Sequence, residues 1–224
     1  YNSATNCFEF NELTAISYAD ARAIDLMMEP HVYDCYSGGS GGIDRFAHLN
    51  VRTFTIIVGT TRRLNLMDTF VDSNLETLRI VNIDGLSCEN DISWGSGSRT
   101  TPRMARLKKI LGDLVFYSGS DWQTYSVKFD MPMLEQIRIR CSYIDADRGL
   151  DFSLCPKLSL ESVRYTIERS TGKPLLTYHP DVYAKLSGDV SNAEASKLSA
   201  DELQEWIALM DLAVANGFTI QTTN

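Results

Sequence analysis

The sequence predicts an α/β fold: an irregular leucine-rich-repeat solenoid with parallel strands on one face and a helix-rich C-terminal capping unit. The main observation is an apolar spacing of the form L-x-x-I-x-I, clearest at residues 134–139. The same spacing returns at residues 75–80, at residues 111–116 and, more loosely, at residues 51–56. Two of the three intervals between these starts fall within the range of about 20–29 residues that is typical of leucine-rich repeats.

Alternating apolar and polar residues within each repeat predict the strands. Residues 54–58 are rich in β-branched side chains and are followed by Gly59, and residues 77–83 and 113–117 continue the pattern. We expect four strands, starting near residues 53, 77, 113 and 136, to pair in parallel and in register. The residues expected to form buried layers are Leu78, Ile80, Leu114, Phe116, Ile137 and Ile139.

Other segments interrupt this pattern. Residues 13–28 suit either a worn first repeat with a helical piece, which we favour, or one short amphipathic helix. Residues 37–42 read Ser-Gly-Gly-Ser-Gly-Gly without the Lys of a phosphate-binding loop, which predicts a flexible loop. Residues 89–101 are polar and predict a loop insertion, and residues 125–129 predict a small extra strand.

The C-terminal third has a helical period. Apolar residues at positions 160, 163 and 167 follow Ser159, and Pro180 is suited to open a short helix. Ser199 and Glu202 have the spacing of a capping box, and Gly217 suits the end of that last helix. Strands are expected at residues 175–178 and 218–221. We therefore divide one continuous solenoid into degenerate repeats (1–150) and strand–helix repeats with a cap (151–224).

Composition limits the class of protein. The 224 residues carry a formal net charge of −8, which disfavours nucleic-acid binding because phosphate contacts need a basic face. No apolar run approaches the roughly 20 residues needed to cross a bilayer, so we expect no membrane insertion of this chain. The five cysteines lack C-x-x-C spacing and are expected to be mostly free and buried. With no start methionine and no signal peptide, a mature product or a fragment is expected.

The tail carries a resemblance to a known family. Residues 151–165, with the run Cys155-Pro156-Lys157-Leu158-Ser159, and residues 179–186, His-Pro-Asp-Val-Tyr-Ala-Lys-Leu, resemble BspA-like leucine-rich-repeat proteins of gut anaerobic bacteria and their prophages. The resemblance covers about residues 151–224, while residues 45–150 match by repeat spacing alone. It implies a right-handed solenoid, a protein-interaction or adhesion role without enzymatic chemistry, and a place at the cell surface or on a phage particle.

Motifs of catalysis and metal binding do not favour an enzyme. His31, His48 and His179 lie far apart, and none has metal-ligand spacing. Asp145 and Asp147 begin a D-x-D pattern, but the twelfth position of a calcium loop would be Pro156 instead of a carboxylate. We therefore predict no catalytic residues, no cofactor and no metal.

The outward positions of the strands predict a binding face for a protein or glycan partner. The expected ladder is Thr53, Thr55, Thr77, Arg79, Asp113, Val115, Tyr117, Gln136, Arg138 and Arg140. The candidate binding residues are Arg79, Tyr117, Gln136, Arg138 and Arg140, because Arg and Tyr are enriched at interface hot spots. Alternatively, each arginine pairs with an acidic neighbour such as Glu76, Glu135 or Asp113 and faces water.

Two functions of different classes follow. The first is a non-catalytic interaction or adhesion module that binds its partner on the strand face. The alternative is a structural component of a phage particle or surface layer whose ends stack on copies of itself.

Overall fold

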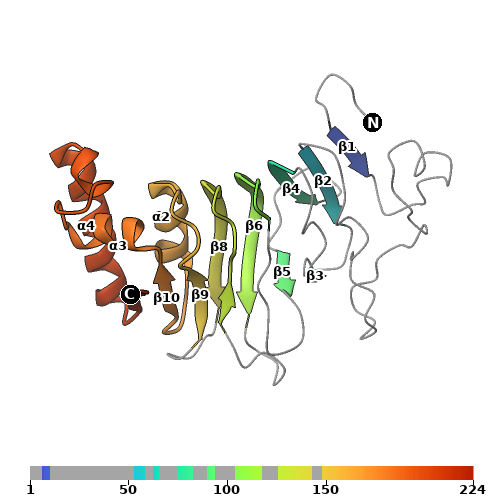
Figure 1. The fold of residues 1–224 in the computed structure, drawn as a ribbon. Coiled ribbons are helices and arrows are strands. Elements are labelled where there is room, and N and C mark those ends of the chain that lie inside the picture. Colours follow the sequence, from blue (N-terminus) through green and yellow to red (C-terminus); the bar gives the residue numbers. More distant parts are fainter. Residues whose placement is uncertain are drawn as a thin grey trace.

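The computed structural model describes residues 7–10, 53–58, 63–65, 75–82, 90–93, 104–117, 126–142 and 148–223. The elements follow one another along one direction, from β1 near the N-terminus to α4 at the opposite end (Figure 1). The described part is an α/β structure with two parallel sheets and a few helices. The expectations for residues 13–28 and 37–42, and for Asp145 and Asp147, lie outside the described residues.

The larger sheet has seven parallel strands. They are β1 (Cys7–Phe10), β2 (Thr53–Val58), β3 (Arg63–Asn65), β4 (Thr77–Asn82), β5 (Asn90–Ser93), β6 (Lys109–Tyr117) and β8 (Gln136–Ser142). Their order is β1-β2-β4-β6-β5-β3, and β8 also pairs with β6. The predicted parallel pairing of β2, β4, β6 and β8 is thereby confirmed.

β6 links two parts of this sheet. Its first residues, from Lys109, pair with β4, whereas Leu114 and Val115 pair with β5. The pairing of β6 with β8 shifts register between Ile110 and Asp113. Gly112 lies in this irregularity with φ of 134°, and a Cβ there would meet the Ile80 carbonyl oxygen at 2.5 Å. A residue with a side chain would be strained at this position, so glycine permits the bulge.

The predicted start of the third strand is wrong. Thr77 and Gln136 are aligned with Lys109, so the strand begins at Lys109, and the residue equivalent to Leu75 and Leu134 is Leu107 rather than Leu111. Extra residues in β6 form the bulge. As a result, the spacing L-x-x-L-x-F at residues 111–116 does not match the alignment of β6 with its neighbouring strands. The polar segment 89–101 was predicted to be a loop, but β5 lies within it.

The smaller sheet has the order β11-β10-β9-β7 and is also parallel. Its strands are β7 (Val127–Lys128), β9 (Gly149–Phe152), β10 (Leu175–Tyr178) and β11 (Thr219–Thr222). β7, β10 and β11 correspond to predicted strands, whereas β9 was not predicted. Gly149 allows β9 and β10 to approach closely, since a Cβ at this position would lie 1.9 Å from the Leu175 carbonyl oxygen.

A chain of backbone hydrogen bonds joins the turns that precede β4, β6, β8 and α2. We call Glu76, Lys108, Glu135 and Ser159 the turn ladder. Lys108 N donates to Glu76 O at 2.8 Å, Glu135 N donates to Lys108 O at 2.8 Å, and Ser159 N donates to Glu135 O at 2.8 Å. Each turn therefore rests on the equivalent turn before it.

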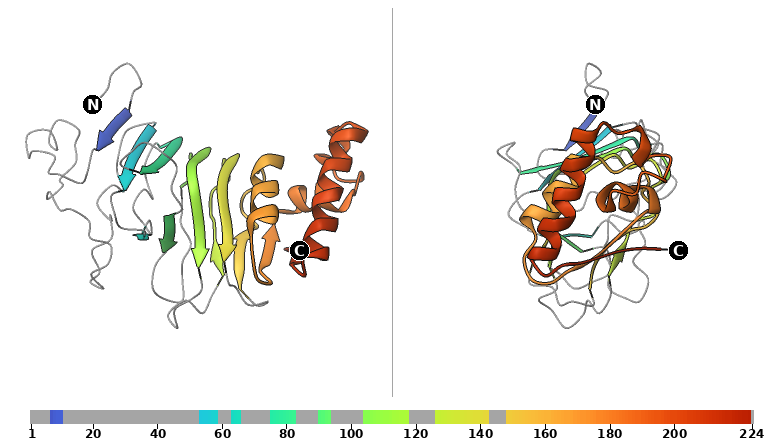
Figure 2. Two further views of the ribbon diagram at one scale, coloured as in Figure 1. Left: turned by 180° about the vertical axis from the view of Figure 1, so that it is seen from behind. Right: turned by 90° about the vertical axis from the view of Figure 1, so that its left-hand side faces the viewer.

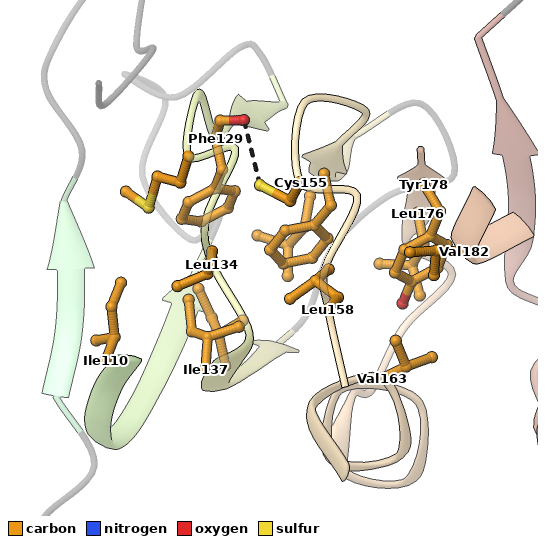
Figure 3. Packing of buried hydrophobic residues seen from close by; sticks show 14 of the residues in the cluster. Ile110, Phe129, Leu134, Ile137, Cys155, Leu158, Val163, Leu176, Tyr178 and Val182 are labelled. Atoms are coloured by element: carbon orange, nitrogen blue, oxygen red, sulfur yellow. Dashed lines mark hydrogen bonds between the residues drawn. The ribbon is translucent and has the colours of Figure 1, made fainter. Parts of the chain in front are cut away.

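The core lies between the two sheets and continues under the helices. All six residues predicted to form buried layers are buried, which confirms their inward orientation. Phe129 stacks on Phe152 with ring centroids 4.7 Å apart, and Phe152 stacks on Tyr178 at 5.8 Å. Figure 3 shows Ile110, Ile137 and Val163 side by side in another row of the core. Successive segments thus place similar side chains next to one another.

Helix α2 (Leu160–Arg169) takes the place beside β8 that a further strand would occupy (Figures 1 and 2). Ser159 caps its N-terminus by accepting from Ser162 N. Ser162 Oγ accepts from Ile137 N at 3.0 Å, and Ser170 Oγ accepts from Cys141 N at 2.9 Å. These hydroxyls satisfy backbone donors of β8 that would otherwise be unpaired at a strand edge.

The remaining helices close the C-terminal end. They are α3 (Pro180–Ser187), the short 3-10 helix η1 (Ala195–Lys197) and α4 (Ala200–Ala215). The predicted capping box of Ser199 and Glu202 at the start of α4 is confirmed. Trp206, Leu209 and Ala213 are buried on its inner side. Within the described residues, no helix has both the length and the apolar character required to cross a membrane.

Candidate strand-face site

The outward positions of β4, β6 and β8 carry a concentration of positive charge. Arg79 lies on β4, Lys109 on β6, and Arg138 and Arg140 on β8. Arg79, Lys109 and Arg138 are exposed, and Arg140 is half-buried. We call these four residues the basic strand face. Asp113 is the acidic residue among the described outward side chains of these strands, so four cations and one carboxylate leave a formal excess of three positive charges.

Lys109 was not among the predicted site residues. It lies beside Thr77 on one side and Gln136 on the other, so it belongs to the first row of the face. Lys109 precedes the strand that the sequence predicts from residue 113, because the apolar spacing there also fits a start at Leu111. The spacing Leu107-x-x-Ile110, which matches Leu134-x-x-Ile137, is the signal that could have identified it.

Arg138 is held between a carboxylate and an aromatic ring. Its Nε lies 3.2 Å from Asp113 Oδ1, and its side chain is 45% exposed. Asp113 and Arg138 are paired residues of β6 and β8, so the sheet register itself brings them together. On the other side, the guanidinium carbon of Arg138 lies 4.8 Å from the ring centroid of Tyr165, a cation–π contact.

Asp113 compensates part of the charge of Arg138. The contact between Asp113 Oδ1 and Arg138 Nε is an ion pair without hydrogen-bond geometry, and Oδ1 is buried without a hydrogen-bond partner among the described residues. Pairing therefore limits the cost of holding this oxygen away from water. Because the pair is partly exposed, its net contribution to stability is small.

Tyr165 joins the site from α2. Burial and the negative charge of Asp113 raise the pKa of the Tyr165 phenol, whereas the positive charges of Arg138 and Arg140 lower it. A hydrogen bond to Asp113 also contributes to the increase. These four side chains therefore form one electrostatic unit across β6, β8 and α2.

The position of Tyr165 follows from the packing of α2. Ser162, Val163, Thr166 and Ile167 face inward and are buried, while Tyr165 lies on the side of the helix next to β8 and is partly exposed. The sequence identified the apolar face of this helix but not its lateral contact with β8. No local signal marked Tyr165 as a site residue, because its role depends on which strand the helix covers.

The predicted site residues lie at different places relative to this electrostatic unit. Arg138 and Arg140 lie two positions apart on β8, and Arg79 lies two strands away on β4. Gln136 is half-buried in the first row, next to Lys109. Tyr117 ends β6 opposite Ser142, and its side chain lies outside the described residues.

Val115 lies on the outward side of β6, as alternation predicted, but it is not exposed. Leu114 and Phe116, on either side of it, belong to the core, whereas Val115 is paired with Asp91 of β5 and Arg140 of β8. Paired residues of a parallel sheet point to the same side, so Val115 shares the face of Arg140. Only 7% of its surface is exposed, so it offers little surface to a partner.

The alternative in which the arginines pair with acidic neighbours holds for Arg138. Arg138 pairs with Asp113, whereas Glu76 accepts a hydrogen bond from Lys108 Nζ at 2.9 Å. Both pairs are partly exposed and contribute little to stability. Pairing therefore fixes the orientation of Arg138 without removing the positive excess of the face.

Other polar groups serve the structure locally. His179 caps α3, with Nδ1 accepting from Asp181 N at 3.2 Å, as expected of a turn residue. Cys141 and Cys155 are free, buried thiols, and burial raises the pKa of each to about 12. In the described part of the chain, no three His, Cys, Asp or Glu residues are grouped so that they could hold a metal ion.

The arrangement can therefore attract and grip anionic groups on an exposed surface. A guanidinium can bind a carboxylate through two parallel hydrogen bonds, and an ammonium such as Lys109 adds long-range attraction. Comparison with protein-family models, with curated proteins and with solved structures finds no match to this chain.

Proposed function

We propose that this protein is a non-catalytic interaction or adhesion module that binds an acidic protein or glycan partner on its basic strand face. The observation that carries the proposal is the excess of positive charge at Arg79, Lys109, Arg138 and Arg140 on a chain of net charge −8. A local field opposite in sign to the whole molecule selects where an acidic partner approaches.

The architecture that we propose for the module is a leucine-rich-repeat solenoid of the BspA-like kind. The in-register parallel strands, the turn ladder and the stacked aromatic rings support it, because each recurs from one segment to the next. In such an architecture the strands present their outward side chains as one continuous surface.

The alternative, a structural component of a phage particle or surface layer, requires ends that stack on copies of the chain. At the C-terminal end, α4 buries Trp206, Leu209 and Ala213 and exposes Asp201, Glu202, Glu205 and Asp211 together with Leu212 and Val214. The four carboxylates on this exposed side would repel those of an identical end, which favours the binding module over stacking through this end. A regular oligomer in size-exclusion chromatography with light scattering would instead favour assembly.

The proposal is tested with immobilised acidic and neutral peptides and glycans. We expect the wild type to bind acidic members and the Arg138→Glu, Arg140→Glu double variant to lose this binding. The matched control is Lys157→Glu, Lys173→Glu, which makes the same change of charge at exposed residues outside the strands. Undiminished binding by the Arg138→Glu, Arg140→Glu variant would exclude this face as the site.

A further inference from the structure

Resting on the proposed function, we propose that the ligand of the basic strand face is an extended acidic peptide with carboxylates at alternate positions, and that Tyr165 positions Arg138 to bind one of them. The proposal commits to a polypeptide among the acidic partners that the face could attract. Its two parts are the spacing of the cations and the restraint on Arg138.

The restraint on Arg138 is direct. Asp113 contacts Nε, and the guanidinium carbon lies over the ring of Tyr165, 4.8 Å from the ring centroid. The two terminal nitrogens can bind a carboxylate through two parallel hydrogen bonds. A side chain already restrained by the contact at Nε and by the Tyr165 ring loses less conformational entropy on binding than a free arginine.

The spacing of the cations fits an extended chain. Arg138 and Arg140 are two residues apart on β8, which corresponds to about 7 Å along a strand. An extended peptide has the same rise per residue, so carboxylates at every second position can face both arginines at once. Lys109 and Arg79, on the neighbouring strands, widen the positive area around this track.

The composition of the face favours a peptide over a dense polyanion. Asp113 lies among the cations and would repel a closely spaced series of phosphates or sulfates. The ring of Tyr165 is half-buried and in contact with the guanidinium of Arg138, so this ring positions Arg138 and is not an open stacking surface for a ligand. Gln136 and Thr77 offer neutral hydrogen-bonding groups of the kind that a peptide backbone can use.

The binding test uses fluorescence anisotropy with a labelled peptide of alternating Glu and Ser. Comparison peptides have the same composition with all Glu in one block, or Gln in place of Glu, and a sulfated heparin oligosaccharide serves as the polyanion. We expect the alternating peptide to bind most tightly, and added salt to weaken its binding. The Arg138→Glu, Arg140→Glu variant should lose affinity by about tenfold or more, whereas Lys157→Glu, Lys173→Glu should not.

The role of Tyr165 is tested by a double-mutant cycle. Tyr165→Leu should weaken peptide binding by about two- to fivefold, the effect of an exposed cation–π contact, and Tyr165→Phe should recover most of this loss because it keeps the ring. In an Arg138→Gln background, Tyr165→Leu should have no further effect. Equal effects in the two backgrounds would show that Tyr165 does not act through Arg138.

The outcomes separate this inference from the proposed function. Equal affinity for the alternating and block peptides, or binding of acidic glycans without acidic peptides, would overturn the extended-peptide ligand and leave the binding face intact. Binding that the Arg138→Glu, Arg140→Glu variant retains in full would overturn both. Circular dichroism and urea unfolding of every variant establish that each loss of affinity occurs in a folded protein.

Discussion

Two buried serines, Ser162 of α2 and the C-cap residue Ser170, should make a measurable contribution to stability. Ser162→Ala removes the acceptor of Ile137 N, and Ser170→Ala removes the acceptor of Cys141 N. Ser162 is 2% exposed and Ser170 is 9% exposed, so water cannot readily replace either hydroxyl. A buried donor left without a partner costs about 1–3 kcal/mol.

The two contributions should be nearly additive. The serines stand about two helical turns apart, which is about 12 Å along the helix axis, and they share no hydrogen-bond partner. The double variant should therefore lose about 2–6 kcal/mol. The carbonyl of Glu135, to which Ser162 Oγ donates, keeps a second donor in Ser159 N and adds no further loss.

Urea unfolding followed by circular dichroism measures these losses as shifts of the midpoint at constant slope. The matched control is Ser196→Ala, an exposed serine whose hydroxyl bonds only the nearby Ala193 carbonyl, and its effect should stay within about 0.5 kcal/mol. If the Ser162 and Ser170 variants are no less stable than this control, their hydroxyls do not satisfy the edge of β8. A changed slope would indicate altered compactness instead.

Three further predictions concern the core and its borders. Ile137→Ala should lower the free energy of unfolding by about 2–5 kcal/mol because Ile137 is buried in the core. Arg138→Ala should change it by no more than about 1 kcal/mol because Arg138 is partly exposed. Equal losses in urea unfolding would contradict the assigned faces. Tyr178→Phe should leave the thermal midpoint unchanged or raise it, since the Tyr178 hydroxyl is buried without a hydrogen-bond partner in the described structure and the ring stack is kept; a clear decrease would reveal a partner. The pKa of Cys141 and of Cys155 is raised to about 12 in the folded state, so between their ordinary value of 9.0 and about 12 the unfolded chain has lost thiol protons that the folded chain retains, and stability should fall as pH rises. Urea midpoints measured at increasing pH test this. Replacing both cysteines by Ala should make the midpoint depend less on pH.

The sequence predicted those parts of the fold that depend on local pattern. Residue alternation located β2, β4 and β8, the apolar period from Leu160 located α2, and the capping box at Ser199 located the start of α4. It did not locate the start of β6, because the bulge at Gly112 lets two overlapping apolar spacings fit the same segment. The short strand β5 was not predicted either, because its mostly polar residues do not show the alternation of apolar and polar side chains that indicates a strand.

The candidate site was predictable only along single strands. Arg138 and Arg140 follow from alternation on β8, and Arg79 follows from alternation on β4. Lys109 required the correct alignment of β6, and Tyr165 required knowledge of where α2 packs. The roles of such residues depend on contacts between segments that are distant in the sequence. No local pattern in a single sequence reveals these contacts.

The turn ladder has a consequence for how protection from solvent is distributed. Its amides at Lys108, Glu135 and Ser159 each depend on the preceding turn being in place. Opening therefore begins where a turn has a neighbour on one side only, and a break at one rung exposes the next. In hydrogen exchange, the amide of Glu135, which has a rung on both sides, should exchange more slowly than the amide of Ser159, which forms the last rung before α2.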